Sequence, residues 1–212
     1  MEMSNEKIIC KWNNEEECYD LEVSDLTATV ADYEATVSRI LAEANARKTY
    51  GDHCAGCSIC CGGRLPLTVV DLYRLKFAGL GMSLPLNRWV AEYGVVEKRN
   101  GCVDITLRLD EYETCALWNR EDGLCSVYQS RPLICRTYIC APLSWRAGEL
   151  RGQIVNAGED ELVRMLGLVN RSDEPETNEP FSGILDYGGV YLRDICSDRL
   201  WRSLTKIGKK IC

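Results

Sequence analysis

The sequence predicts an α+β fold: a mostly helical single domain with a small antiparallel sheet and irregular cysteine-rich loops around a metal site. Three observations lead to this prediction. Apolar residues recur at helical spacing between residues 24 and 48, they alternate with polar residues between 102 and 109, and eight cysteines form two groups beside these segments. The 212 residues suffice for one domain with a substantial core.

The first fifty residues predict a hairpin followed by a helix. Residues 7–12 and 18–23 have the composition of two short strands joined by a polar turn. Ser24 or Asp25 can cap a helix that runs to about Lys48. The apolar face of this helix is expected to pack on the core and consists of Leu26, Val30, Tyr33, Val37, Ile40, Leu41 and Ala44.

The next fifty residues predict two short helices and a strand. Thr68 and Asp71 have the spacing of a capping box, and apolar residues at helical spacing follow them. Pro85 suits the first turn of a second helix, which extends from residue 86 to about 93. Residues 102–109 alternate between apolar and polar side chains, which is typical of a half-buried strand.

Further strands and helices are predicted toward the C-terminus. Residues 115–118 favour a strand, and Asp122-Gly123 marks a turn into residues 124–128. A small antiparallel sheet can therefore bring Cys115 and Cys125 close together. Helices are expected at about 159–168 and 190–207, separated by an exposed acidic loop at 171–180.

These elements predict three regions of one domain. Residues 1–49 form an N-terminal hairpin and helix packed on the core, and residues 50–142 form a cysteine-cluster metal-binding region. Residues 143–212 form a C-terminal helical region of the same domain. The sequence contains no internal repeat.

The net charge of −7 argues against nucleic acid as a partner, because phosphate binding needs clustered lysine and arginine. No run of eighteen apolar residues and no export signal is visible, so we expect a cytoplasmic protein without a membrane partner. Cytosolic reductants keep thiols reduced. Thirteen cysteines therefore indicate metal binding rather than a disulfide scaffold.

Eight of the cysteines have the spacing of metal ligands. The first four follow the pattern C-x2-C-x2-C-C, and the other four begin about fifty residues later. Zinc sites commonly combine two C-x2-C pairs, whereas thiolates at repeated three-residue intervals are typical of a [4Fe-4S] cluster. The spacing favours iron–sulfur, with zinc as the alternative. The candidate metal- and cofactor-binding residues are Cys54, Cys57, Cys60, Cys61, Cys115, Cys125, Cys135 and Cys140.

The number of centres is left open by the sequence. Cys60 and Cys61 are adjacent, and adjacent side chains of an extended backbone point to opposite faces, so one of them can reach a second centre. Eight cysteines divide into two four-sulfur sites, which we favour, or into one cluster with extra thiolates nearby.

Charged and rigid residues flank the cysteines. Arg64, Arg131 and Arg136 are expected to offset the negative charge of the thiolates. Pro132 restricts the backbone and can aim Cys135.

The remaining cysteines have no mutual ligand spacing and are expected to be small buried side chains. Cys102 is also a candidate spare ligand or redox thiol, because the strand alternation places it opposite the apolar face. His53 precedes Cys54 directly, and we favour a loop role for it over a ligand role. Trp118 is expected to be a core or edge aromatic. The five cysteines without mutual ligand spacing are Cys10, Cys18, Cys102, Cys196 and Cys212.

Three further motifs accompany the eight cysteines: Cys125-Ser126-Val127-Tyr128, Arg131-Pro132 and Cys135-Arg136-x-Tyr138-x-Cys140. Together with the C-x2-C-x2-C-C pattern they resemble the YkgJ-type CxxCxxCC cysteine-cluster family, whose members are described as zinc- or iron-chelating proteins. The resemblance covers about residues 50–142. It implies that the eight cysteines bind metal, and it implies no particular reaction.

Three classes of function follow. The first is an iron–sulfur protein that transfers electrons or delivers metal or cluster to a client protein. The second is a structural zinc module that serves protein interactions. The third is a metal-dependent enzyme that modifies proteins, because flagellin lysine methylases carry a similar cysteine pattern in a longer chain; no catalytic residue is assigned. A protein client or redox partner is expected in the first class.

Overall fold

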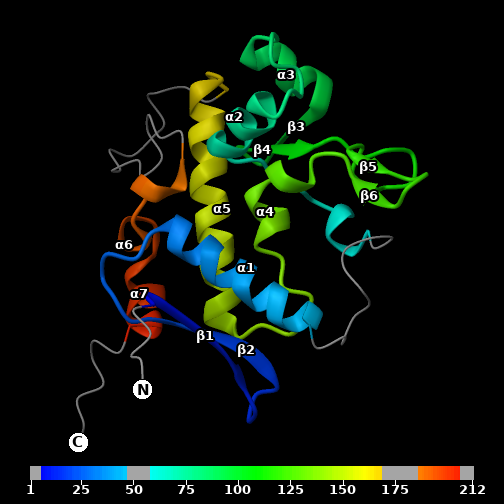
Figure 1. Cartoon of the computed structure of the whole chain (residues 1–212). Coiled ribbons are helices and arrows are strands. Elements are labelled where there is room, and N and C mark those ends of the chain that lie inside the picture. The colour runs from blue at the N-terminus through cyan, green and yellow to red at the C-terminus, as the bar shows by residue number, and fades with distance from the viewer. Residues whose placement is uncertain (1–5, 47–57, 169–185, 206–212) are drawn as a thin grey trace, which may run out of the picture.

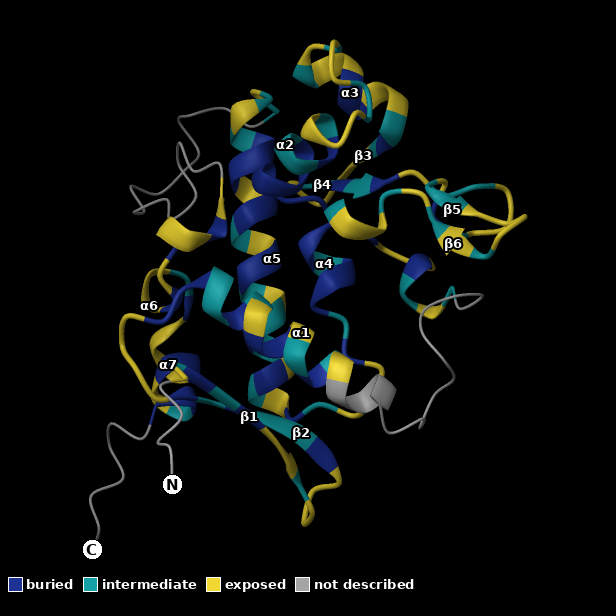
Figure 2. Cartoon of the chain, in the orientation of Figure 1, coloured by how far each residue is buried: buried dark blue, intermediate teal, exposed yellow. Residues whose placement is uncertain are grey.

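Helix α5 (Trp145–Met165) forms the axis around which the other elements are arranged (Figure 1). The computed structural model describes residues 6–46, 58–168 and 186–205. Within these ranges, α5 contacts β2, β4, α2, α4, α6 and α7. Its buried side chains include Leu150, Ile154 and Leu162, so the helix lies in the core along most of its length (Figure 2).

The sequence prediction placed the start of α5 too late, at about residue 159. The helix begins after Ser144, whose hydroxyl accepts a hydrogen bond from the backbone N–H of Ala147. Gly148 and Gly152 lie in the first two turns, and each glycine costs a helix about 1 kcal/mol relative to alanine. Burial of the helix against the rest of the core outweighs this local preference.

The N-terminal hairpin is confirmed. Strand β1 (Ile8–Asn13) pairs antiparallel with β2 (Cys18–Val23). The Asn13 side chain accepts hydrogen bonds from the backbone N–H groups of Glu15 and Glu16, which closes the turn. One face of the hairpin is buried and contributes Ile8, Cys10, Leu21 and Val23 to the core.

Helix α1 (Val30–Ala46) begins later than the sequence predicts. Its first turn is capped by Thr29 and Asp32, each of whose side chains accepts a hydrogen bond from the backbone N–H of the other. Asp25 instead closes a turn with Thr27, and Leu26 is exposed. The predicted apolar face is otherwise buried at Val30, Tyr33, Val37 and Ile40, while the side chain of Ala44 lies outside the described residues.

Segments from the N-terminal region and the C-terminal third are joined beside the start of α1. The backbone N–H of Val30 donates to the carbonyl of Val190 (2.9 Å), and the N–H of Leu192 donates to the carbonyl of Ala28 (2.9 Å). The hairpin is joined in the same way to the start of α5, because Ser144 N–H donates to the carbonyl of Tyr19 (2.9 Å). Backbone hydrogen bonds therefore hold the N-terminal region to the C-terminal third.

The predicted helix at 190–207 is divided in two. Helix α6 (Leu192–Ile195) follows the single turn η4 (Tyr187–Gly189) and ends at Cys196. Ser197 then caps α7 (Asp198–Leu204) by accepting a hydrogen bond from the N–H of Leu200. The predicted loop at 171–180 lies outside the described residues.

The capping box before α2 (Val69–Phe77) and the helix after Pro85, α3 (Leu86–Tyr93), are both confirmed. Strand β4 (Cys102–Leu107) is confirmed as well, and it pairs with a strand that the sequence analysis missed, β3 (Gly94–Arg99). The Asn100-Gly101 dipeptide joins them with positive φ at both residues, as a two-residue hairpin turn requires. That dipeptide was the signal for the missing strand.

The remaining short elements surround the cysteines: η1 (Ile59–Cys61), β5 (Trp118–Asn119), β6 (Leu124–Cys125), η2 (Tyr128–Ser130) and α4 (Leu133–Arg136). The described residues thus combine helices with three separate two-stranded antiparallel sheets, which confirms the α+β class. None of the helices within them is long and apolar enough to cross a membrane.

A buried polar cluster joins α2, α4 and η4. Asp71 is fully buried and accepts hydrogen bonds from the N–H of Thr68 (3.0 Å), the N–H of Leu133 (2.8 Å) and the hydroxyl of Tyr187 (2.8 Å). Burial raises the pKa of Asp71, and these hydrogen bonds oppose the rise by favouring the carboxylate. Arg136 is also buried and forms an ion pair with Glu34 of α1.

Replacing Tyr187 by Phe tests this cluster. The change keeps the ring but leaves Asp71 and Thr68 with one partner fewer in a dry environment, so we expect a loss of about 1–3 kcal/mol in the free energy of unfolding. Urea unfolding monitored by circular dichroism measures it. Tyr191→Phe is the matched control, because Tyr191 is exposed; equal stability of the two variants would contradict the assignment.

Candidate metal centre

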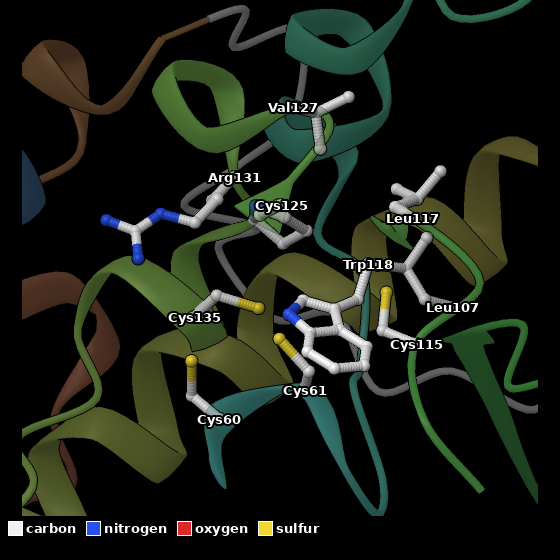
Figure 3. A pocket seen from close by; sticks show the side chains of 11 residues that line it. Cys60, Cys61, Leu107, Cys115, Leu117, Trp118, Cys125, Val127, Arg131 and Cys135 are labelled. Carbon is white, nitrogen blue, oxygen red and sulfur yellow. The ribbon is translucent and has the colours of Figure 1, made fainter. Parts of the chain in front are cut away.

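Five of the cysteines that the structure describes line one small cavity, namely Cys60, Cys61, Cys115, Cys125 and Cys135 (Figure 3). The cavity has a volume of about 10 Å³, close to the space that one water molecule occupies. Its remaining wall is mostly apolar. It consists of Leu107, Leu117, Trp118, Val127, Arg131 and Pro132.

Cys60 and Cys61 lie in the single turn η1. The N–H of Cys61 donates to the carbonyl of Ser58 (2.8 Å), which closes the turn. The expectation that these adjacent side chains point to opposite sides assumed an extended backbone and is wrong. In the 3-10 turn both thiols line the same cavity.

A backbone hydrogen bond joins the two groups of cysteines. The N–H of Cys115 donates to the carbonyl of Cys61 (2.6 Å), and Gly62 forms a β-bridge with Thr114 next to it. The backbone segment that carries Cys61 and the segment that carries Cys115 therefore hold each other in place.

Cys125 reaches the cavity from β6. Trp118 of β5 is its direct cross-strand partner, and the N–H of Trp118 donates to the carbonyl of Cys115 (2.9 Å). The regular pairing is shorter than predicted, since Cys115 precedes β5 and forms a bridge with Leu109. The prediction that this hairpin brings Cys115 and Cys125 together is confirmed by their shared cavity.

Cys135 reaches the cavity from α4. Pro132 precedes this helix with extended dihedral angles, and its carbonyl accepts the N–H of Cys135 (3.0 Å). The next residue, Leu133, donates its N–H to Asp71. Pro132 thus stands at the start of the helix that carries Cys135, and the buried polar cluster holds the helix in place.

Of the three arginines expected near the thiolates, only Arg131 lines the cavity. Its guanidinium lies 3.8 Å from the centre of the Tyr128 ring and donates to the Tyr128 carbonyl. Arg64 is bound to Asp104 (2.6 Å) and to Glu159 (2.9 Å) instead. Arg136 belongs to the buried polar cluster described above.

The thiols influence one another's ionisation. A hydrogen bond from Cys61, and then the positive charge of Arg131, lower the pKa of Cys60, while the same hydrogen bond raises the pKa of Cys61. Burial and the neighbouring thiols raise the pKa of Cys115 to about 11 and also raise that of Cys135. One thiolate forms readily in the cavity, and each further thiolate then needs a cation.

The other predicted ligands are not placed at this cavity. Cys140 is exposed and does not line it. Cys54, Cys57 and the neighbouring His53 lie outside the described residues. In the part of the chain that is described, no group of three His, Cys, Asp or Glu side chains is arranged to hold a metal ion.

The cysteines without ligand spacing mostly follow expectation. Cys10, Cys18 and Cys196 are buried, Cys102 is exposed at the start of β4, and Cys212 lies outside the described residues. Burial raises the pKa of Cys196 to about 12, as expected for an inert core thiol.

Residues 53–156 match the CxxCxxCC family model, which is described as a putative zinc- or iron-chelating domain. This match confirms the resemblance seen in the sequence, and the chain therefore carries a domain of this family. The chain matches no curated protein and no solved structure. The matched range contains all five cysteines of the cavity.

The residues of the cavity fit a thiophilic metal. The five thiols provide sulfur donors, and the apolar wall excludes competing water. The indole N–H of Trp118 is buried without a hydrogen-bond partner among the described residues, so the wall also offers a free donor for a charged sulfur. Nothing in the residue spacing distinguishes Trp118 from an ordinary edge aromatic, so the sequence alone does not predict this buried donor.

The lowered pKa of Cys60 predicts selective alkylation. In protein stripped of metal, iodoacetamide at pH 7 is expected to modify Cys60 first, because a lowered pKa leaves more of the reactive thiolate at neutral pH. Cys196, with its raised pKa, is expected to stay unmodified in the folded protein. Peptide mass spectrometry over time gives both rates, and faster labelling of Cys196 would overturn the assignment.

Proposed function

We propose that this chain binds an iron–sulfur cluster, of the [4Fe-4S] type, and uses it for electron transfer or for delivery of iron or cluster to a client protein. The observation that carries the proposal is the convergence of five thiols on one apolar cavity. The repeated three-residue spacing of Cys54, Cys57 and Cys60 favours a cluster over a single ion.

The candidate ligands among the described residues are Cys60, Cys61, Cys115, Cys125 and Cys135. A bound cluster would supply reversible one-electron chemistry. The residues of the chain bind it, exclude water through the apolar wall, and offset thiolate charge through Arg131. Cys54 and Cys57 stay predicted ligands on the strength of their spacing, and so does Cys140, although it does not line the cavity.

The surroundings of the cavity suit contact with a protein partner. Ile59, Leu124 and Tyr128 are large exposed hydrophobic residues that adjoin cavity residues in the sequence. Exposed apolar groups close to a centre are typical of surfaces where proteins exchange electrons or metal. We propose a protein client or redox partner there.

The second candidate is a structural zinc site, and the cavity volume favours it. A space of about 10 Å³ suits a single ion, whereas a cluster requires the surrounding side chains to move outward. Zinc would hold η1, α4 and the β5–β6 hairpin together without redox chemistry.

Metal content and colour distinguish the two candidates. Anaerobically purified protein is expected to be brown, with iron and sulfide in equal amounts and sulfur-to-iron charge-transfer absorption in the visible range. Cys135→Ser is expected to lose most of this absorption, whereas Cys196→Ser, which replaces a buried thiol away from the cavity, keeps it. A colourless wild-type protein with stoichiometric zinc would reject the cluster and support the second candidate.

Dithionite treatment separates the two proposed roles of a cluster. Bleaching that reverses on reoxidation without loss of iron is expected for an electron carrier, because the ligands must hold both redox states. Net movement of iron from the loaded protein to an apo-protein acceptor, measured after separating the two, indicates delivery. If neither reversible bleaching nor transfer of iron is observed, both proposed roles are rejected.

A further inference from the structure

Trp118 presents a buried polar group to the cysteine cavity. Its side chain lines the cavity together with the five thiols, and its indole nitrogen is directed toward the side that carries the sulfur atoms of Cys61 and Cys135 (Figure 3). The Nε1 atom is buried and has no hydrogen-bond partner among the described residues. An indole nitrogen can only donate, so it needs an acceptor.

Leaving such a donor unpaired is unfavourable, since a buried unsatisfied group costs about 1–3 kcal/mol. A phenylalanine at this position would fill similar space without that cost. The five thiols are weak acceptors while they carry their protons, and they become charged acceptors when a metal displaces those protons. The donor therefore suits the metal-loaded state better than the metal-free one.

Backbone hydrogen bonds and a cation–π contact hold the indole of Trp118 in place. Its backbone is fixed by the hydrogen bond to Cys115 and by pairing with Cys125. The guanidinium of Arg120 lies 5.5 Å from the ring centre and is itself bound to Asp110 (2.6 Å). A cation over the ring draws electron density from it and strengthens the N–H as a donor.

We propose that Trp118 is a positioning residue for the metal centre and that its Nε1–H donates a hydrogen bond to a cysteine thiolate of the loaded site. The inference rests on the proposed metal binding and applies to an iron–sulfur or a zinc centre. Such a hydrogen bond withdraws charge from sulfur, which stabilises the thiolate, and in a cluster it raises the reduction potential.

The test compares Trp118→Phe with Trp145→Phe, which alters an exposed tryptophan at the start of α5. Zinc ion is the probe, and its affinity is measured anaerobically by competition with a chromophoric chelator. Loss of a hydrogen bond to a ligand typically weakens metal binding about 10–100-fold, so we expect that loss in Trp118→Phe and wild-type affinity in the control.

Nuclear magnetic resonance of the wild-type protein gives an independent readout, even if Trp118→Phe does not fold. The chain has five tryptophans, so ¹⁵N-indole labelling yields five N–H signals, assigned by replacing each of the other four in turn. Zinc addition is expected to shift the Trp118 signal downfield and to slow its exchange with water. The Trp145 signal should stay unchanged.

The outcomes separate the inference from the function on which it rests. Zinc binding by the wild type with an unmoved Trp118 signal, or with equal affinity in Trp118→Phe, would overturn the role of Trp118 and leave metal binding intact. A wild-type protein that takes up neither zinc nor iron would reject metal binding, and the role of Trp118 with it.

Discussion

The backbone hydrogen bond between Cys115 and Cys61 is the contact on which the site depends. It joins segments that are more than fifty residues apart in the sequence and sets two thiols beside one another before any metal is involved. Around this contact, the β5–β6 hairpin supplies Cys125 and helix α4 supplies Cys135. A shared cavity results because backbone hydrogen bonds join η1 to the segment before β5, while the Asp71 side chain holds α4.

Placing several thiols in an apolar wall creates an electrostatic conflict. Each thiol is easiest to bury while neutral, yet only the thiolate binds metal well. Of the charged side chains that the structure describes, Arg131 alone lines the cavity, and it offsets a single negative charge. The pKa values of Cys115 and Cys135 are raised because further negative charge in this cavity is unfavourable. A multivalent cation removes this penalty when it displaces the protons. Such an environment favours cations that compete well for sulfur.

Local signals predicted part of the fold and of the site. The Thr68–Asp71 capping box and the β1–β2 hairpin were readable because their cues lie within a few residues. The start of α5 was not predicted, because burial of this helix in the core outweighs the low helix propensity of the two glycines in its first turns.

At the site, the sequence identified which cysteines are candidate ligands, and the structure shows how the described ones are oriented. The shared direction of Cys60 and Cys61 depends on the 3-10 turn, which their spacing alone does not specify. Arg64 and Arg136 lie near cysteines in the sequence, but the carboxylates of Glu159 and Glu34 bind them elsewhere. Trp118 lies beside the cavity because it pairs with Cys125 across the two strands, and amino-acid composition does not predict that pairing.

The backbone bonds from Val30 to Val190 and from Leu192 to Ala28 bear on how the protein matures. During translation the first helix emerges from the ribosome long before its C-terminal partner has been synthesised. Until residues 190–192 have been synthesised, the N–H of Val30 and the carbonyl of Ala28 lack these backbone partners. The N-terminal segment around Ala28 and Val30 therefore gains its full set of backbone partners only late in synthesis.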